Sequence, residues 1–449
     1  MNLEQWMLAP VTEVEEVDLF ERYLLGVEEG LEWFEAMKEA LTLGEASSWF
    51  KLLERPLVQK LLGMSHKVLA LHEDNFTPPE RTPWGGYEIV RKYKRAHGVE
   101  TTAIVGESWE VSGHPSFPSK FFFRYGGRQL LVPITVLEAL VPEELYGARN
   151  VVHYGRQMPF LVKLLNSGSW RSYRGKLETF FKESIATLNN HELHQMLSSS
   201  KEKKLISMHQ EMLTKNLSVQ VHPRQGVFVD RPAKTEAWTI IDAEEGAGLY
   251  LGLKENVTKA QFEETMRSGK DVSNYLNFVE VKAGDVFFIP AGTLHAIGAG
   301  VLLLEVQETS ETTFRAYDWG RLSEGKPRQL HLDETMAATS WEGARGQVLV
   351  EELRRKPKKD QHQQVLVDEK EFRQMRLTFS QRDDDYEGDT SLTGIQAFTV
   401  INGSVKVHAG ESAESFGAGC SLIIPAAVGS YRLVAEKDHT VVMQVRGGK

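Results

Sequence analysis

The sequence of 449 residues contains one cysteine, Cys420, and no long apolar run. A single cysteine excludes intramolecular disulfides and predicts that any tight metal site uses His, Glu, Asp or Gln rather than cysteine. No segment approaches the roughly 20 apolar residues that a membrane helix needs. The first residues, Met1–Gln5, lack the basic start and apolar run of a secretory signal. We therefore expect a cytoplasmic protein in a reducing compartment, without a membrane partner.

The chain also has fewer basic than acidic residues: 52 basic and 62 acidic residues give a net charge of -10 at pH 7. Such a surface argues against a nucleic acid or an acidic membrane as the main partner. An anionic substrate would need a local basic pocket. The basic segment Arg354–Lys359 contains Pro357 and is interpreted as a link between two parts of the chain; nucleic-acid binding is the alternative.

The length is typical of two or three domains. Residues 1–75 carry apolar side chains near helical spacing and predict an N-terminal helical extension. Residues 76–345 contain short apolar runs punctuated by glycine and proline, which predicts a β-rich domain. Within that domain, residues 167–216 change to helical spacing and predict a helical insertion. Residues 346–449 predict a second β-rich domain, so the fold is expected to be mainly β with helical additions.

Two stretches of the sequence repeat each other. Residues 284–295 (GDVFFIPAGTLH) have the glycine, proline and histidine spacing of the second cupin signature, and residues 419–430 repeat it with Ser430 in the place of His295. Upstream, residues 236–241 (EAWTII) align with 396–401 (QAFTVI). The first position is therefore a carboxylate in one copy and an amide in the other. This self-similarity predicts two related cupin-type β-barrels, or jelly rolls. The first would be chemically active, and the C-terminal one degenerate and structural.

Four residues in the first copy have the types and spacing of a metal site. Gln220 and His222 are two positions apart in a segment of strand character, so their side chains leave the same face of the sheet. Glu236 begins another strand, and His295 closes the cupin motif. Two imidazoles, a carboxylate and an amide oxygen suit one Zn²⁺ per chain with a position left open for water or substrate. The same ligands would also accept Fe(II), Mn or Co.

The prediction of a metal site depends on the joint pattern rather than on any single histidine. An isolated histidine in a β protein is usually a surface or hydrogen-bonded residue. His191 and His194, for example, could share a helix face, but they do not form the His-Glu-x-x-His motif. They are expected to lie at a solvated helix end.

Five motifs in the same order resemble type I phosphomannose isomerase, the zinc-dependent mannose-6-phosphate isomerase. The resemblance covers residues 78–166 and 217–330, and extends weakly to the C-terminal barrel. The N-terminal helices and the insertion fall outside it. The motifs are GESWE (106–110), LSVQVHP (217–223), KTE (234–236), PAGTLHAIG (290–298) and TTFRAYDWGR (312–321).

This resemblance implies a role for each matching residue. The zinc ligands of the family correspond to Gln220, His222, Glu236 and His295. A catalytic arginine corresponds to Arg315, and an acidic residue near the reacting carbons to Glu305. Residues that hold the substrate correspond to Ser218 and Lys234, and Arg321 lies in a matched motif as a further partner for the phosphate.

The expected activity is the interconversion of mannose 6-phosphate and fructose 6-phosphate by proton transfer through a cis-enediol. A metal would polarise the carbonyl, and Arg315 would reinforce it with a permanent charge. Glu305 is the first candidate for the base, followed by metal-bound water and Lys234. Three alternatives stay open: an isomerase of another aldose or sugar phosphate, a metal-dependent oxygenase, and a non-catalytic sugar-binding cupin. The sequence leaves the oligomeric state open.

Overall fold

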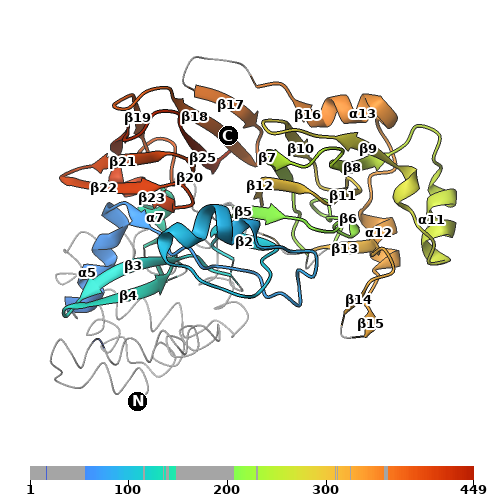
Figure 1. Ribbon diagram of the computed structural model, residues 1–449, viewed down its shortest axis with the longest axis horizontal. Coiled ribbons are helices and arrows are strands. Elements are labelled where there is room, and N and C mark those ends of the chain that lie inside the picture. Colours follow the sequence, from blue (N-terminus) through green and yellow to red (C-terminus); the bar gives the residue numbers. More distant parts are fainter. Residues whose placement is uncertain are drawn as a thin grey trace, which may run out of the picture.

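The computed structural model describes residue 17 and most of the chain from residue 56 onward. The described ranges are 56–114, 117–134, 136–137, 141–147, 207–228, 231–308, 310, 312–323, 325–357 and 363–448. Two β-rich parts lie side by side, as Figure 1 shows: one drawn in green and yellow, and one in orange to red. The chain is therefore mainly β, as the sequence predicts.

The first β-rich part consists of two antiparallel sheets. One has the strand order β16-β10-β7-β12-β5-β2, and the other β13-β6-β11-β8-β9. Every residue of the central strand β12 is buried, because sheets or loops cover both of its faces. The strands are β2 (Glu107–Val111), β5 (Ser207–Met212), β6 (Val219–Val221), β7 (Glu236–Ala243), β8 (Gly248–Leu253), β9 (Leu276–Glu280), β10 (Val286–Ile289), β11 (His295–Ile297), β12 (Val301–Gln307), β13 (Phe314–Tyr317) and β16 (Arg354–Arg355).

The second β-rich part has the same strand order. Its sheets run β1-β23-β20-β25-β18-β17 and β19-β24-β21-β22, so each strand from β17 to β25 has a counterpart in the first part that comes in the same chain order. The strands are β1 (Leu69–Ala70), β17 (Gln363–Asp368), β18 (Phe372–Phe379), β19 (Asp385–Asp389), β20 (Gln396–Asn402), β21 (Ser404–Ala409), β22 (Ser412–Gly417), β23 (Ser421–Ile424), β24 (Ser430–Ala435) and β25 (Thr440–Gly447).

Strand register extends this repeat to single residues. Glu236 pairs with Ile289 on one side and Gln307 on the other. In the second part, Gln396 pairs with Ile424 and Arg446. Glu305 on β12 pairs with Trp238 of β7, and Gln444 on β25 pairs with Phe398 of β20. Glu305 and Gln444 therefore occupy equivalent positions in the two parts. The repeat predicted from the sequence is therefore present in the described strands.

Helices and two hairpins surround the sheets. At the start of α11, Thr258 and Gln261 form a capping box. The helices are α5 (Pro56–Leu62), η1 (Gly63–His66), η2 (Val90–Lys94), η3 (Arg95–His97), α7 (Pro142–Tyr146), α11 (Lys259–Arg267), η5 (Ser273–Tyr275), α12 (Leu332–Ala338), α13 (Gly346–Leu353) and η6 (Ala426–Val428). The hairpins are β3 (Lys120–Tyr125) with β4 (Arg128–Pro133), and β14 (Leu322–Ser323) with β15 (Lys326–Pro327).

Three local predictions need correction. Residues 207–212, at the end of the predicted helical insertion, form strand β5, because pairing with β2 and β12 overrides the helical preference of Met, Gln and Glu. Residues 69–70, in the predicted N-terminal helical extension, form β1 and pair with β23. Residues 90–97 are helical (η2, η3) within a stretch predicted to be β-rich. Apart from Val17, residues 1–55 of the predicted extension, and residues 167–206 of the insertion, lie outside the described residues.

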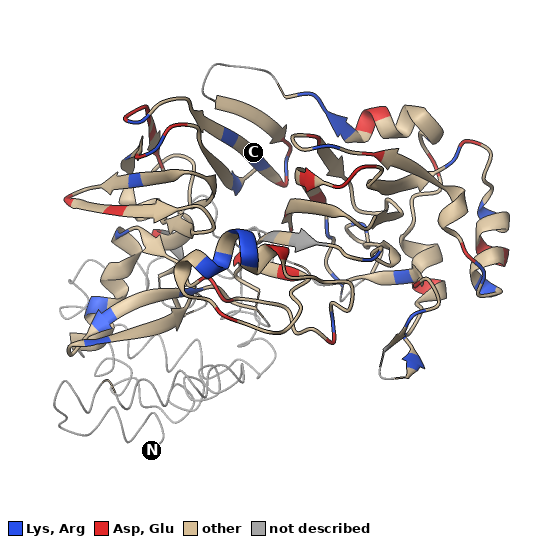
Figure 2. Cartoon of the chain, viewed as in Figure 1, with Lys and Arg blue, Asp and Glu red and all other residues tan. Residues whose placement is uncertain are grey.

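A buried ion pair joins the two β-rich parts. Lys94 Nζ lies 2.7 Å from a carboxylate oxygen of Glu110 and donates to the carbonyl of Gly419 at 3.0 Å, while Ser421 Oγ donates to Glu110 at 2.9 Å. Elsewhere, basic and acidic residues are interspersed over both parts in the view of Figure 2. None of the helices in the described part of the chain has both the length and the apolar character that crossing a membrane requires.

Candidate metal centre and active site

Strand register gathers three side chains on one face of the first sheet. Glu236 and Trp238 are two positions apart on β7, so both side chains project to the same side. Glu305 on β12 is the direct cross-strand partner of Trp238, and directly paired residues share a face. The sheet therefore presents two carboxylates and an indole together.

The second sheet supplies the other groups. His295 on β11 and Arg315 on β13 are both cross-strand partners of Gln220 on β6. These three residues form a row across neighbouring strands and so project to one side. His222 follows two positions after Gln220 and faces the same way. Residues far apart in the sequence thus meet between the two sheets.

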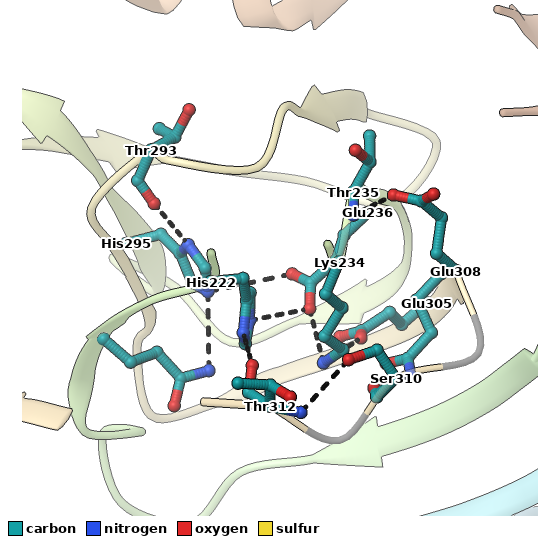
Figure 3. Close-up of polar contacts among 12 residues, drawn as sticks. His222, Lys234, Thr235, Glu236, Thr293, His295, Glu305, Glu308, Ser310 and Thr312 are labelled. Carbon is teal, nitrogen blue, oxygen red and sulfur yellow. Dashed lines mark hydrogen bonds and ion pairs between the residues drawn. The ribbon is translucent and has the colours of Figure 1, made fainter. Parts of the chain in front are cut away.

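His222, Glu236 and His295 form a buried cluster whose candidate ligand atoms all lie within 4.8 Å of one another. His222 Nε2 lies 2.9 Å from Glu236 Oε1, and His295 Nε2 lies 3.7 Å from Glu236 Oε2. Each of the three residues is 1% exposed. Figure 3 shows both rings directed toward the carboxylate.

Backbone carbonyls orient both rings. The Nδ1–H of His222 donates to the carbonyl of Thr312, and that of His295 to the carbonyl of Thr293, each at 2.8 Å. Because a carbonyl can only accept, Nδ1 carries the proton in both rings and Nε2 has a free lone pair. This is the arrangement found around histidines that bind metals.

The protonation and hydrogen bonding of the cluster fit a divalent cation. Burial lowers the pKa of His295 to about 4, so the ring is neutral near pH 7. Burial raises the pKa of Glu236, but the Lys234 ammonium and the two imidazoles outweigh it and hold that pKa well below its usual value. Among the described residues, no donor hydrogen-bonds His222 Nε2 or Glu236 Oε2, and the ion pair with Lys234 reaches only Glu236 Oε1. Buried acceptors that lack a donor need another partner, and a metal ion would be one.

Gln220 stands beside this cluster. Its Nε2 lies 3.4 Å from His295 Nε2, and its Oε1 accepts a hydrogen bond from Ser218 Oγ at 3.3 Å. Rotation of the amide about its last bond would exchange the two atoms and present the oxygen to the cluster. Gln220 is therefore placed to act as a fourth ligand, and Ser218 to orient it.

Lys234 and Glu305 form an adjoining charged pair. Lys234 Nζ lies 2.6 Å from Glu236 Oε1 and 3.4 Å from Glu305 Oε1, and the indole N–H of Trp238 donates to Glu305 Oε2 at 3.1 Å. Burial and the neighbouring Glu236 carboxylate raise the pKa of Glu305 well above its usual value, although Lys234 opposes them. A carboxyl group with a raised pKa can accept and return a proton near neutral pH.

Arg315 has two other arginines, Arg321 and Arg328, as neighbours. Its Nη1 donates to the carbonyl of Gln329 at 2.9 Å, and its Nε is buried without a hydrogen-bond partner among the described residues. Burial and the neighbouring Arg328 lower the pKa of Arg315 to about 10. Both Arg321 and Arg328 donate to Asp318, and Arg321 also donates to the carbonyl of Asn216 at 2.7 Å. Arg321 is therefore engaged in the protein and is not aimed at the cluster.

Sequence reasoning missed two polar groups at this site. The sequence alignment identified Trp238 only as an aromatic residue equivalent to Phe398. The structure adds that its indole N–H donates to Glu305, a hydrogen bond that a phenylalanine cannot make. Arg328 lies beyond the matched motifs, and no sequence signal connects it with Asp318. The carbonyls of Thr293 and Thr312 could not have been found, because any residue supplies that group.

Curated relatives resemble part of this chain. It is 28% identical over 260 residues to the mannose-6-phosphate isomerase of Streptococcus mutans, a match that covers 56% of this chain and 63% of that protein. It is 42% identical over 126 residues to mannose-6-phosphate isomerase ManA of Bacillus subtilis, covering 27% of this chain and 39% of that protein. Both relatives are mannose-6-phosphate isomerases. The chain thus spans less than two thirds of the length of each, and no protein-family model matches it.

Solved structures share the fold more completely. Mannose 6-phosphate isomerase from Bacillus subtilis superposes with a TM-score of 0.56 at 20% identity, covering 84% of this chain and 99% of that one. A zinc-bound mannose 6-phosphate isomerase superposes with a TM-score of 0.54 at 12% identity, covering 85% of this chain and 100% of that one. At these identities the likeness establishes the fold.

Proposed function

We propose that the protein is a metal-dependent aldose–ketose isomerase that interconverts mannose 6-phosphate and fructose 6-phosphate. The observation that carries this proposal is the buried His222–Glu236–His295 cluster beside the Lys234–Glu305 pair. The curated relatives that bear the name of this activity support the choice of reaction. The zinc-bound neighbour supports Zn²⁺ as the metal.

Gln220, His222, Glu236 and His295 would hold the zinc, one ion per chain. When bound, the ion supplies a Lewis acid that polarises the sugar carbonyl and the adjacent hydroxyl. The protein's own part is to keep the ligands deprotonated and in place. Burial of His295 and the fixed Nδ1 protons of both histidines serve this purpose.

Glu305 is our candidate for the base that moves the proton between C1 and C2. It would take the proton from one carbon to give a cis-enediol and return it to the other. Its raised pKa makes the carboxyl group capable of both steps, and the Trp238 indole fixes one of its oxygens. Lys234, held between two carboxylates, would adjust the charge of the pair and help move protons between substrate oxygens.

The substrate phosphate would lie toward Arg315, Arg321 and Arg328. Arg321 and Arg328 share one carboxylate, Asp318, while Arg315 donates to a neutral backbone carbonyl. The three guanidinium groups therefore leave local positive charge in an acidic protein. Arginine binds phosphate oxygens through paired N–H donors. Because the Lys234 ammonium already contacts two carboxylates, we propose it for the reacting end of the sugar rather than for the phosphate.

We also propose that the two pairs of sheets are two cupin-type barrels: a catalytic domain, predicted within 76–345, and a degenerate domain, predicted over 346–449. Helix α13 and strand β16 (residues 346–355) pack with the first barrel, so the second begins at β17. In the second, Gln396 and Gln444 stand at the positions of Glu236 and Glu305. Tyr431 O–H donates to Gln396 Oε1 at 2.5 Å, and Gln444 donates to Tyr431 at 3.0 Å. Neutral groups that satisfy one another replace the charged ones, so this copy would serve as structure.

The proposal is tested by following mannose 6-phosphate by NMR under nitrogen, with free mannose and other aldose phosphates in parallel. We expect fructose 6-phosphate to form from mannose 6-phosphate at equal rates with and without oxygen. A preference for another sugar would retain the isomerase but change its substrate. No turnover of any aldose would refute the proposal. A His408→Gln variant, changed on β21 outside the site, should keep full activity.

A further inference from the structure

A second group of candidate metal ligands, separate from the catalytic cluster, lies where β1 and η3 meet the turn before β23. Glu73, His97 and Cys420 come from three separate segments, and their ligand atoms all lie within 4.8 Å of one another. Cys420 immediately precedes β23. None of the three residues takes part in the proposed isomerase reaction.

The topology explains why they meet. Strand β1 pairs antiparallel with β23 through Leu69 and Ile423, and Leu71 N–H continues the ladder to the carbonyl of Ser421. Glu73, two residues after Leu71, therefore lies next to Cys420, the last residue of the turn before β23. Helix η3 ends at His97, beside the same turn.

The distances suit a tetrahedral ion. Cys420 Sγ lies 3.6 Å from Glu73 Oε1 and 3.6 Å from His97 Nδ1. With a metal–sulfur bond of about 2.3 Å and bonds of about 2.0 Å to nitrogen or oxygen, tetrahedral geometry places such ligand pairs about 3.5 Å apart. Sγ also lies 3.7 Å from His97 Nε2, so the imidazole must turn to direct Nδ1 at a cation held by Cys420 and Glu73.

The surroundings fix the ring and the turn. His97 Nε2 lies 2.7 Å from the carbonyl of Ala418, so Nε2 carries the proton and Nδ1 has the free lone pair. A carbonyl behind the ring is a common support for a metal-bound histidine. Gly419 has φ +91°, and a Cβ there would stand 2.3 Å from the carbonyl oxygen of Tyr93. The turn can therefore pack closely against η2 and η3 only because glycine occupies this position.

Charge and reactivity favour a metal over a redox role. A thiolate, a carboxylate and a neutral imidazole together balance a divalent cation, while the nearby Lys94 is already paired with Glu110. Burial and the Glu73 carboxylate raise the pKa of the Cys420 thiol to about 12. The bare thiol is therefore a poor nucleophile at neutral pH.

We propose that Glu73, His97 and Cys420 bind a second divalent metal ion, Zn²⁺ or a similarly soft cation, which fastens the segments before β2 to the C-terminal sheets. On binding, the Cys420 sulfur gives its proton to solvent and coordinates as a thiolate. Water would complete the shell. The sequence prediction that no tight metal site uses cysteine did not consider one thiolate combined with His and Glu.

Cobalt tests the site, because the chain has one cysteine and any thiolate-to-cobalt charge-transfer absorption must come from Cys420. The full-length protein would be stripped with a chelator and titrated with Co²⁺. We expect the absorption to appear and to saturate by two equivalents, because the catalytic cluster also takes up Co²⁺. Its presence does not depend on metal at the catalytic cluster, so the test separates this proposal from that of the isomerase.

Zinc content per chain provides the second measurement. We expect two zinc ions in the reloaded protein, one in Cys420→Ser and in His97→Ala, and two in the control His72→Ala, whose histidine lies in the same segment outside the cluster. Isomerase activity should be unchanged in Cys420→Ser. No charge-transfer absorption in the wild type, or equal zinc in wild type and Cys420→Ser, would overturn the proposal and leave a hydrogen-bonded thiol.

Discussion

The buried ring of His295 makes the stability of the metal-free protein depend on pH in a calculable way. Its pKa is about 4 in the folded chain, against an ordinary value of 6.5. A depressed folded pKa contributes stability above pH 6.5, and that contribution is lost as pH falls toward 4. Between pH 6.5 and 5 the loss is about 2 kcal/mol, at about 1.36 kcal/mol for each pH unit.

Urea denaturation of chelated wild type and of His295→Gln, each at pH 7 and pH 5, measures the contribution of His295 to the free energy of unfolding. Glu305, whose pKa is shifted upward, is present in both proteins and cancels to first order. We expect the wild type to lose about 2 kcal/mol more unfolding free energy than His295→Gln over this interval. Equal losses in the two proteins would show that His295 is not held neutral, and the reasoning about ligand protonation would fail.

Three further predictions concern other residues of the two proposals. Glu305→Gln should lower kcat roughly 10²–10⁴-fold while zinc content, measured by mass spectrometry, stays unchanged; an unaltered kcat would exclude Glu305 as the base. Arg315→Ala should lower kcat/KM and weaken inhibition by inorganic phosphate, and unchanged phosphate inhibition would place that subsite elsewhere. Lys94→Met leaves the Glu110 carboxylate buried and unpaired, so it should destabilise the protein by about 3–5 kcal/mol; a loss below about 1 kcal/mol in denaturation would mean that the pair is solvated.

The repeat is the part of the fold that the sequence predicted best. Glycine and proline spacing marked the strands that precede His295 and Ser430, and the sheets place these residues at the starts of β11 and β24. Period two correctly oriented Gln220 and His222, because strand geometry alone fixes which side chains share a face. The local sequence pattern was sufficient to predict which side chains share a face wherever the segment is a regular strand.

Local pattern failed where distant contacts decide the structure. Four of the six residues 207–212 are good helix formers (Met, Gln, Glu and Met), yet two neighbouring strands hold the segment as β5. The pairing of β1 with β23 joins segments about 350 residues apart, and nothing near Leu69 signals it. The same pairing brings Glu73 close to Cys420, a proximity that the sequence could not predict.

Polar partners at the active site were equally hidden. The indole N–H of Trp238 and the carbonyls behind His222 and His295 are set by strand register, which the sequence does not specify. Lys234 was matched to a residue that holds the substrate. Its contacts with Glu236 and Glu305 were not predictable from the sequence, and they are the reason that we propose it for the reacting end of the sugar.

The central claim is that metal held by the His222–Glu236–His295 cluster makes the protein an isomerase. The most direct test is the rate of mannose 6-phosphate turnover in protein that has been chelated and then given two equivalents of zinc, with His222→Asn as the matched variant. We predict that activity disappears on chelation, returns with zinc in the wild type and does not return in the variant. Full activity in the chelated protein, or equal recovery in His222→Asn, would contradict the account.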